Sequence, residues 1–244
     1  MDNKYVKKYY QKEIMLHRVQ KLLSNYGYCS REQAEKLIKQ GRVKVNDKII
    51  SIGDKASEDD EIKVDSEVVS KQKKVYIIFN KPLDCVTALI DKKFKTVMDY
   101  ININERVFPI GRLDHNTTGL LLLTNDGDFA NKVMHPKYNV NKTYFVKLSS
   151  PIGDRQIRQI ESGILLEDGK TSPSKVKRID SKSVEITIHE GKKRIVRRMM
   201  RQLDLGILEL KRISIGKLTL GNLKEGKHRK LKKEEMRLIF ENGM

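Results

Sequence analysis

The feature that most constrains the fold of this chain is a run of four leucines, Leu120 to Leu123. Such a run predicts a buried strand. The segment just before it, GRLD (Gly111 to Asp114), carries one positive and one negative charge. Because Val107 to Ile110 also has the pattern of a strand, we expect Asp114 to be held at a strand end, against the core. A carboxylate in that place is partly desolvated, which costs stability unless a cation is close.

A costly charge on a rigid element is typical of a catalytic site. The sequence offers no other catalytic signature: it has no metal-ligand spacing of histidine, cysteine and acidic residues, no serine elbow, no P-loop and no dinucleotide-binding glycine motif. If the chain is an enzyme, a single carboxylate must therefore act as nucleophile or general base. The alternative interpretation of GRLD is a tight turn with a surface ion pair, which is worth about 0–1 kcal/mol.

The charge of the chain indicates its kind of partner. Its 50 Lys and Arg residues against 32 Asp and Glu give a net charge of +18. A protein this basic usually binds a polyanion, nucleic acid before an anionic membrane surface. The segment Lys192 to Arg201 alone carries six positive charges and no acid. No apolar run approaches the ~20 residues needed to span a bilayer, no secretory signal is recognisable, and the two cysteines have no metal spacing. We therefore predict a cytoplasmic protein without membrane attachment.

The first part of the chain has the pattern of a small module of helices and strands. Apolar residues at helical spacing predict a helix over residues 16–23. Ser30 followed by Gln33 is the pattern of a capping box, which predicts a second helix. Alternating apolar and polar residues then predict short strands around an Asn46-Asp47 turn and at residues 61–64.

The rest of the chain predicts a larger domain. Strands outnumber helices, and the strand–helix alternation of a doubly wound sheet is missing, so the predicted fold class is α+β with a mostly antiparallel mixed sheet. Strands are predicted at 75–82, 107–110, 119–124, 143–148, 183–189 and 213–220, and helices at 126–134, 154–163, 193–203 and 232–242. The predicted segments are a basic N-terminal arm (1–13), the small module (14–69), a polar linker (70–74) and the larger domain (75–244).

The small module has one basic face. On its second predicted helix, Arg31, Lys36 and Lys39 lie away from the apolar positions, and Arg42 follows directly. Taken alone, this is most often a solvated helix face. The whole segment LxxYGYCSREQAEKLIKQGRVKVNDKII, however, resembles the αL RNA-binding module first seen in a small-subunit ribosomal protein, over roughly residues 16–69. The resemblance implies that the second helix and the following loop lie on RNA backbone. A DNA-binding helix-turn-helix is the alternative.

Four ordered segments of the larger domain carry a second resemblance. They are FPIGRLDHNTTGLLLLTNDGDFA from Phe108, NKTYFVKL from Asn141, HEGKKRIVRRMM from His189 and LKRISIGKLTLGNLKEGKHRKL from Leu210. In this order, and after an αL module, they look very much like the motifs of the ribosomal-RNA pseudouridine synthases. The resemblance covers nearly the whole chain except about the first dozen residues. It implies the pseudouridine synthase fold and an enzyme that isomerises a uridine of ribosomal RNA.

The second resemblance also implies roles for single residues. Asp114 is expected to be the essential carboxylate, Tyr144 to stack on the flipped uracil, and Arg197 to pair with Asp114 and keep it ionised. One position departs from the family: Ile195 stands where Gln, Glu or His is usual. Leu220 is expected to form the floor of the base pocket. The other residues expected to shape the site or bind the substrate are Arg112, Thr118, Lys142, Lys192, Arg194 and Arg198.

The implied reaction fits the residues at hand. Pseudouridine formation breaks the C1′–N1 glycosidic bond, rotates the base and rejoins it through C5. Because no atom is gained or lost, we expect no cofactor and no metal. The target base must leave its stack, and the segment Lys192 to Arg201 can offset that cost by binding the phosphate backbone. The carboxylate could attack C1′ or C6, or stabilise an eliminated sugar, and the sequence leaves these routes open.

Two classes of function remain open from the sequence. One is the RNA isomerase, and the other is a non-catalytic RNA-binding or ribosome-assembly factor with the same basic surfaces. The set of Asp114, Tyr144 and Arg197 favours the enzyme, because a binding protein has no reason to keep a costly carboxylate facing phosphates. The substrate is large-subunit or small-subunit rRNA, free or in an assembly intermediate, and the segment Gly163 to Val176 resembles the large-subunit branch more. We expect a monomer that acts without a guide RNA.

Overall fold

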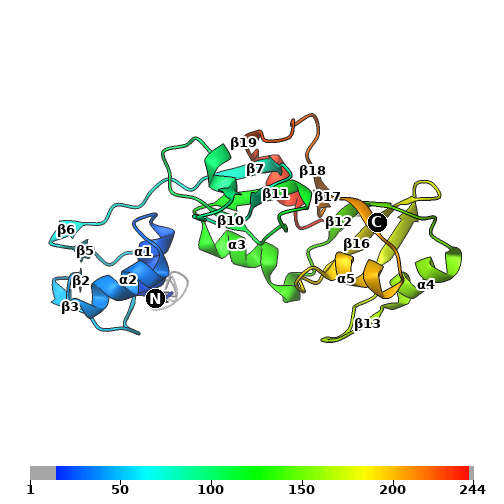
Figure 1. Cartoon of the computed structure of the whole chain (residues 1–244). Helices are drawn as coiled ribbons and strands as arrows, with labels where there is room; N and C mark the ends of the chain where they lie inside the picture. Colours follow the sequence, from blue (N-terminus) through cyan, green and yellow to red (C-terminus); the bar gives the residue numbers. More distant parts are fainter. Residues whose placement is uncertain (1–14, 242–244) are drawn as a thin grey trace, which may run out of the picture. The chain divides into compact units, whose positions relative to one another are not determined.

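The computed structural model describes residues 15–241 and divides the chain into two compact units, one ending at Lys73 and the other beginning at Lys74 (Figure 1). The predicted basic arm and Asn242, the last residue of the final predicted helix, lie outside the described residues. Each unit has its own hydrophobic core. Within residues 15–241, no helix is both long enough and apolar enough to cross a bilayer.

The first unit packs two helices against short strands. Its core joins the apolar faces of α1 (Val19–Asn25) and α2 (Arg31–Lys39). The first helix begins three residues later than predicted, and Leu16 is exposed. The Ser30 hydroxyl caps α2 by accepting a hydrogen bond from the Gln33 amide at 3.1 Å, which satisfies one of the unpaired amides at a helix start. The strands are β1 (His17–Arg18), β2 (Val43–Val45), β3 (Lys48–Ile49), β4 (Lys55–Ala56), β5 (Ile62–Val64) and β6 (Glu67–Val68), in a sheet of order β3-β2-β5-β6 and a separate β1-β4 pair.

The residues predicted as a linker are attached to the units on either side. The Gln72 amide donates to the carbonyl oxygen of Tyr26, within the first unit, at 3.2 Å. The Lys74 ammonium lies 2.9 Å from the Asp126 carboxylate, within the second unit. Gln72 is therefore tied to the first unit through its backbone, and Lys74 to the second unit through its side chain.

The second unit is built on one nine-stranded sheet. Its strands are β7 (Tyr76–Lys81), β10 (Phe108–Ile110), β11 (Thr118–Thr124), β12 (Lys142–Leu148), β15 (Lys175–Arg178), β16 (Ser183–Ile188), β17 (Ile207–Ile215), β18 (Leu218–Thr219) and β19 (His228–Lys230). The order is β15-β16-β12-β17-β11-β7-β19, with β10 beside β11 and β18 beside β17. Only the β11–β17 pair of this sheet is parallel. The predicted α+β class with a mostly antiparallel mixed sheet is confirmed.

Helices and two small strand pairs complete the second unit. The α-helices form where the apolar spacing predicts them, although α5 and α6 are shorter than predicted. The helices are η1 (Val97–Tyr100), α3 (Gly127–Met134), η2 (Pro136–Tyr138), α4 (Asp154–Ser162), α5 (Ile195–Gln202) and α6 (Lys233–Leu238). The strand pairs are β8 (Cys85–Val86) with β9 (Lys95–Thr96), and β13 (Leu165–Leu166) with β14 (Gly169–Lys170).

The four leucines of β11 are buried on both faces of the sheet. Successive side chains of a strand point to opposite faces, so Leu120 and Leu122 join one core cluster and Leu121 and Leu123 join another. Residues of α3 pack on the first face and residues of η1 on the second. A continuous apolar run is what a strand covered on both faces needs, which explains the sequence at this point.

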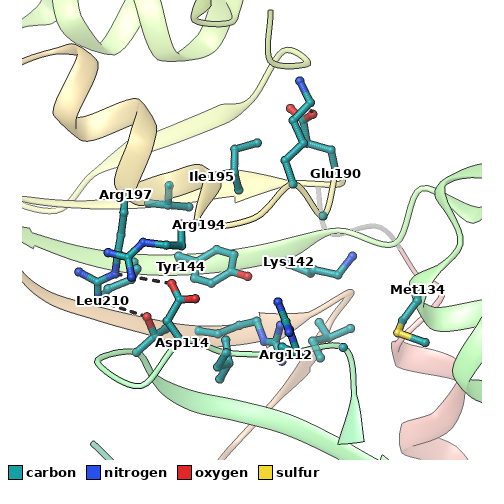
Figure 2. A pocket seen from close by; sticks show the side chains of 18 of the residues that line it. Arg112, Asp114, Met134, Lys142, Tyr144, Glu190, Arg194, Ile195, Arg197 and Leu210 are labelled. Carbon is teal, nitrogen blue, oxygen red and sulfur yellow. Dashed lines mark hydrogen bonds and ion pairs between the residues drawn. The ribbon is translucent and has the colours of Figure 1, made fainter. Parts of the chain in front are cut away.

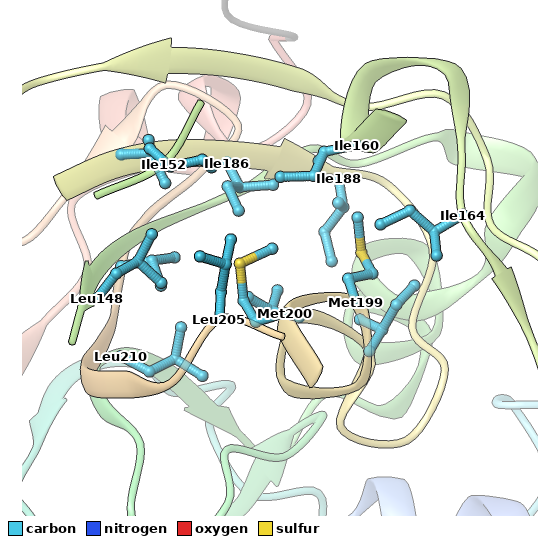
Figure 3. Packing of buried hydrophobic residues seen from close by; sticks show 14 of the residues in the cluster. Leu148, Ile152, Ile160, Ile164, Ile186, Ile188, Met199, Met200, Leu205 and Leu210 are labelled. Carbon is cyan, nitrogen blue, oxygen red and sulfur yellow. The ribbon is translucent and has the colours of Figure 1, made fainter. Parts of the chain in front are cut away.

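The other half of the sheet has its own core, formed with α4 and α5 (Figure 3). Met199 and Met200 of α5 have no exposed surface, and they pack with Leu148 of β12, Ile186 of β16 and Leu210 of β17. Because one side of α5 is buried in this way, its basic residues face away from the core. This packing fixes the start of α5 relative to strands β12 and β17.

A glycine permits the parallel contact at the centre of the sheet. Gly119 of β11 pairs with Arg212 of β17 and has a φ of +103°. A Cβ atom at this position would overlap the backbone of Arg212. Only glycine combines this backbone conformation with so close an approach, so Gly119 sets the spacing between the two strands.

Candidate active site

A cavity of about 220 Å³ lies in the second unit, among the connection from β10 to β11, the strands β12 and β17, and the start of α5 (Figure 2). Six of its lining residues are basic and two are acidic, so the lining has a formal charge of +4. A cavity of this charge suits a ligand that carries phosphates. The basic residues are Arg112, Lys142, Lys192, Arg194, Arg197 and Arg212, and the acidic residues are Asp114 and Glu190.

Asp114 lies in the connection between β10 and β11 and not at a strand end, so that expectation is wrong. The connection is nevertheless held in place. The Thr87 hydroxyl donates to the Leu113 carbonyl at 2.8 Å and accepts from the Leu113 amide at 3.2 Å. The Thr117 amide donates to the Asp114 carbonyl at 3.0 Å. These bonds give Asp114 the rigid support that we expected from a strand.

A buried lysine holds the same connection from β7. Lys81 has no exposed surface, and its ammonium donates to the carbonyl oxygens of Pro82, His115 and Thr117 at 2.9, 3.3 and 3.0 Å. Burial lowers the pKa of Lys81, because a charged group loses its hydration there. Three carbonyl partners replace that hydration, so the ammonium fixes the backbone on the C-terminal side of Asp114.

Asp114 and Arg197 form an ion pair without a hydrogen bond. The Asp114 carboxylate is 33% exposed, and its Oδ2 lies 3.8 Å from Nε of Arg197. Arg197 instead donates from Nη2 to the Asn116 carbonyl at 2.6 Å and the Thr117 hydroxyl at 3.2 Å. Burial lowers the pKa of Arg197, but a guanidinium stays protonated at neutral pH. Among residues 15–241 the Asp114 carboxylate accepts no hydrogen bond, so its oxygens are open to a substrate beside a fixed positive charge.

Strand β12 presents Tyr144 and Lys142 to the cavity. The two residues are two positions apart and so lie on the same face of the strand. Figure 2 shows Tyr144 beside Asp114, with Lys142 farther along the cavity. The Lys142 ammonium donates to the Val140 carbonyl at 3.0 Å. Burial, with a smaller effect of nearby Arg212, lowers the pKa of Lys142 to about 8. This cation lacks a counter-ion in the part of the chain that is described, which favours an anionic ligand.

The start of α5 supplies both basic and apolar lining. Arg194, its N-cap residue, has a left-handed backbone with a φ of +53°, which costs about 1–3 kcal/mol for a residue other than glycine. Ile195, the residue that departs from the family pattern, is 6% exposed and forms an apolar wall of the cavity. The Lys192 ammonium lies 3.7 Å from the Glu190 carboxylate. The cavity therefore combines an apolar wall with charges around it.

Three residues predicted for the site do not line the cavity. Arg198 makes two hydrogen bonds to Asp168, at 2.8 and 3.0 Å. Thr118 is buried in β11, and its neighbour Thr117 lines the cavity instead. Leu220 belongs to the core cluster beside β11 and does not form the pocket floor. The apolar lining consists of Ile110, Leu113, Val133, Met134, Ile195, Val196, Leu210 and Ile215.

Arg212 is a lining residue that the sequence prediction missed. It is 3% exposed, and its Nε donates to the Leu120 carbonyl at 2.7 Å. The signal in the sequence was its spacing, because Arg212 and Leu210 are two positions apart and thus share the buried face of β17.

The four basic residues predicted to bind RNA in the first unit differ in whether they have an ion-pair partner. Arg31, Lys36 and Lys39 are exposed on α2, as predicted, and Arg42 follows the helix. Lys36 pairs with an acid one turn away at 2.9 Å, and Arg42 makes two hydrogen bonds to Asp65. Arg31 and Lys39 have no ion-pair partner among the described residues. These two cations are the most available for a polyanion.

Comparison with known proteins decides the family. The sequence model described as RNA pseudouridylate synthase matches residues 75–202, more than half of the chain. This chain belongs to the RNA pseudouridylate synthase family. It is therefore an enzyme that isomerises uridine to pseudouridine in RNA, and the matched region contains Asp114, Tyr144 and Arg197. The S4 domain model matches residues 17–62, which places a domain of the predicted RNA-binding kind before the synthase domain.

Two relatives and a solved structure support this family assignment over most of the chain. Ribosomal large subunit pseudouridine synthase B of Bacillus subtilis (strain 168) is 43% identical over 233 residues, which cover 92% of this synthase and 96% of the relative. Dual-specificity RNA pseudouridine synthase RluF of Escherichia coli (strain K12) is 33% identical over 226 residues, which cover 91% of this synthase and 78% of the relative. A crystal structure of a pseudouridylate synthase matches with a TM-score of 0.69 at 32% identity, over 91% of this chain and 99% of the other. The predicted family and fold are confirmed.

Proposed function

We propose that this synthase converts a uridine of large-subunit ribosomal RNA to pseudouridine. The observation that carries the proposal is the Asp114 carboxylate, held rigidly 3.8 Å from Arg197 in a positively charged cavity. The RNA class is supported by the relative at 43% identity, whose name refers to the large ribosomal subunit. Small-subunit rRNA is the alternative substrate.

We assign each central side chain one task. Asp114 acts on the sugar or the base at the glycosidic bond, and its open carboxylate oxygens support this role. Tyr144 stacks on the flipped uracil, a contact worth about 1–3 kcal/mol. Arg197 stabilises the ionised carboxylate from a position fixed by its bonds to Asn116 and Thr117. The apolar wall at Ile195 excludes water from the base.

We propose that the RNA backbone binds to the synthase at two places. Near the site, Arg112, Lys192 and Arg194 contact the phosphates around the flipped nucleotide, supported by their place in the cavity lining. In the first unit, Arg31 and Lys39 contact a second stretch of RNA, supported by their exposure. Each phosphate contact releases counterions, so affinity falls steeply with salt. We also propose a cytoplasmic monomer that needs no guide RNA, because the chain itself carries both the RNA-binding domain and the site.

Pseudouridine mapping tests the substrate. Large-subunit and small-subunit rRNA transcripts are incubated with the synthase, treated with carbodiimide and read by primer extension. One new stop on the large-subunit transcript is the expected result. A stop on the small-subunit transcript alone would make that RNA the substrate. Tight binding without any stop on naked RNA, followed by a stop on isolated assembly intermediates, would place the reaction on a partly assembled particle.

A further inference from the structure

Arg212 is a buried cation that leaves most of its hydrogen-bonding capacity unused. Its Nε donates to the Leu120 carbonyl at 2.7 Å. Among residues 15–241, neither Nη1 nor Nη2 has an acceptor, Nη2 is fully buried, and no carboxylate lies within ion-pair distance. A guanidinium carries two N–H groups on each of these nitrogens. Burying a guanidinium with so few partners is costly. Because Nη1 is not among the fully buried atoms and Arg212 lines the cavity, Nη1 is the donor that a ligand can complete.

The position of Arg212 indicates which ligand that is. In the pairing of β12 with β17, Arg212 lies directly opposite Tyr144, the residue that stacks on the base in the proposed function. Both residues line the same cavity. Lys142, two positions before Tyr144, is a second, partly buried cation there, and its lowered pKa is partly due to the charge of Arg212. The wall beside the base therefore holds two positive charges without an acid of their own.

We infer that Arg212 donates a hydrogen bond to a carbonyl oxygen of the flipped uracil and stabilises the negative charge that the base takes when the glycosidic bond breaks. This inference rests on the proposed function. When the C1′–N1 bond breaks, its electron pair goes to the base and is spread over N1, O2 and O4. The base then turns, C5 forms the bond to C1′, the proton of C5 leaves, and N1 takes up a proton. No atom or electron is gained or lost overall.

Arg197, the arginine paired with Asp114, is less suited to this task. Arg197 donates to Asn116 and Thr117 from Nη2, and its unpaired Nε lies 3.8 Å from the Asp114 carboxylate and not at the wall opposite Tyr144. Arg212 is held by Leu120 and has its remaining donors unpaired. A hydrogen bond from a guanidinium to a neutral carbonyl is modest, but it strengthens as the oxygen becomes negative. Such a contact therefore acts mainly on the transition state and on kcat.

The first test replaces the charge with a side chain of similar length. Arg212→Met should lower kcat by about 100- to 1000-fold, the usual effect of losing one fixed donor to a developing anion. Affinity for the RNA should change less than about threefold, and the melting temperature should not fall, because methionine removes a buried charge. Arg178→Met, at an exposed arginine of β15 that pairs with Asp154, is the matched control and should keep wild-type turnover.

Sulfur substitution in the RNA separates a direct contact from a structural role. The target uridine is replaced by 2-thiouridine or 4-thiouridine, because sulfur accepts hydrogen bonds poorly. In the wild type, one of the two should slow turnover by at least about tenfold, and in Arg212→Met the same substitution should have little further effect. Equal sulfur effects in both proteins, or an Arg212→Met variant as active as the wild type, would overturn the inference alone. An inactive wild type on natural rRNA would overturn the proposed function as well.

Discussion

The lowered pKa of Lys142 predicts how the stability of the synthase changes with pH. This pKa is about 8 in the folded synthase, against 10.5 for an ordinary lysine. Because the folded state holds this proton less tightly, unfolding takes up a proton between about pH 8 and pH 10.5. Stability is therefore lost as the pH falls through this window, and the loss is complete below about pH 8. At ~1.4 kcal/mol per pKa unit, the loss is about 3 kcal/mol.

Lys142→Met removes this charge and keeps an apolar chain. The variant should be more stable than the wild type by up to about 3 kcal/mol at pH 7, and by only about 1 kcal/mol at pH 10. Urea unfolding is followed by hydrogen exchange of peptides from β12, so that the transition of the second unit is read directly. Lys147→Met, at an exposed lysine of the same strand, is the control and should show no such pH dependence. A Lys142→Met variant that is less stable at pH 7, or equally stabilised at both pH values, would refute the reasoning.

Two further predictions concern the sheet and the first unit. Gly119→Ala should destabilise the synthase by more than about 2 kcal/mol, because the added Cβ overlaps the backbone of β17 and the φ is strained. Gly153→Ala, where only one side-chain atom lies near at 3.7 Å, should cost much less in the same thermal denaturation. Changing both Arg31 and Lys39 to Gln should weaken rRNA binding and reduce the slope of log affinity against log salt by about 1–2, measured by filter binding. Lys36→Gln, which removes an already paired cation, should have a smaller effect, and equal losses would contradict the role given to α2.

The parts of the fold that local patterns determine were predictable. The four leucines of β11 read as a buried strand because a strand covered on both faces needs an unbroken apolar run. The Ser30 cap was predictable because the helix start needs a side-chain acceptor at that one position. The chain order of the family motifs located Asp114, Tyr144 and Arg197 in the sequence, and the structure brings all three to one cavity.

The parts that depend on long-range pairing were not predictable from local sequence. Arg212 donates to Leu120, 92 positions earlier, only because β17 lies beside β11 in the sheet. Lys81 reaches the carbonyl of His115, 34 positions later, for a similar reason. Leu220 is apolar, as a residue of a pocket floor would be, but the strand order places it in the core instead. The local sequence shows which of these residues are apolar and which are charged, but the strand order determines their contacts.

The central claim is that the Asp114 carboxylate carries the reaction and is not needed for binding. Pseudouridine formation releases the hydrogen on C5, so rRNA labelled with tritium at C5 of uridine reports each turnover. We predict that Asp114→Asn binds this RNA as tightly as the wild type and releases tritium at least about 1000-fold more slowly. An Asp114→Asn variant that binds normally and releases tritium within about tenfold of the wild-type rate would contradict the account.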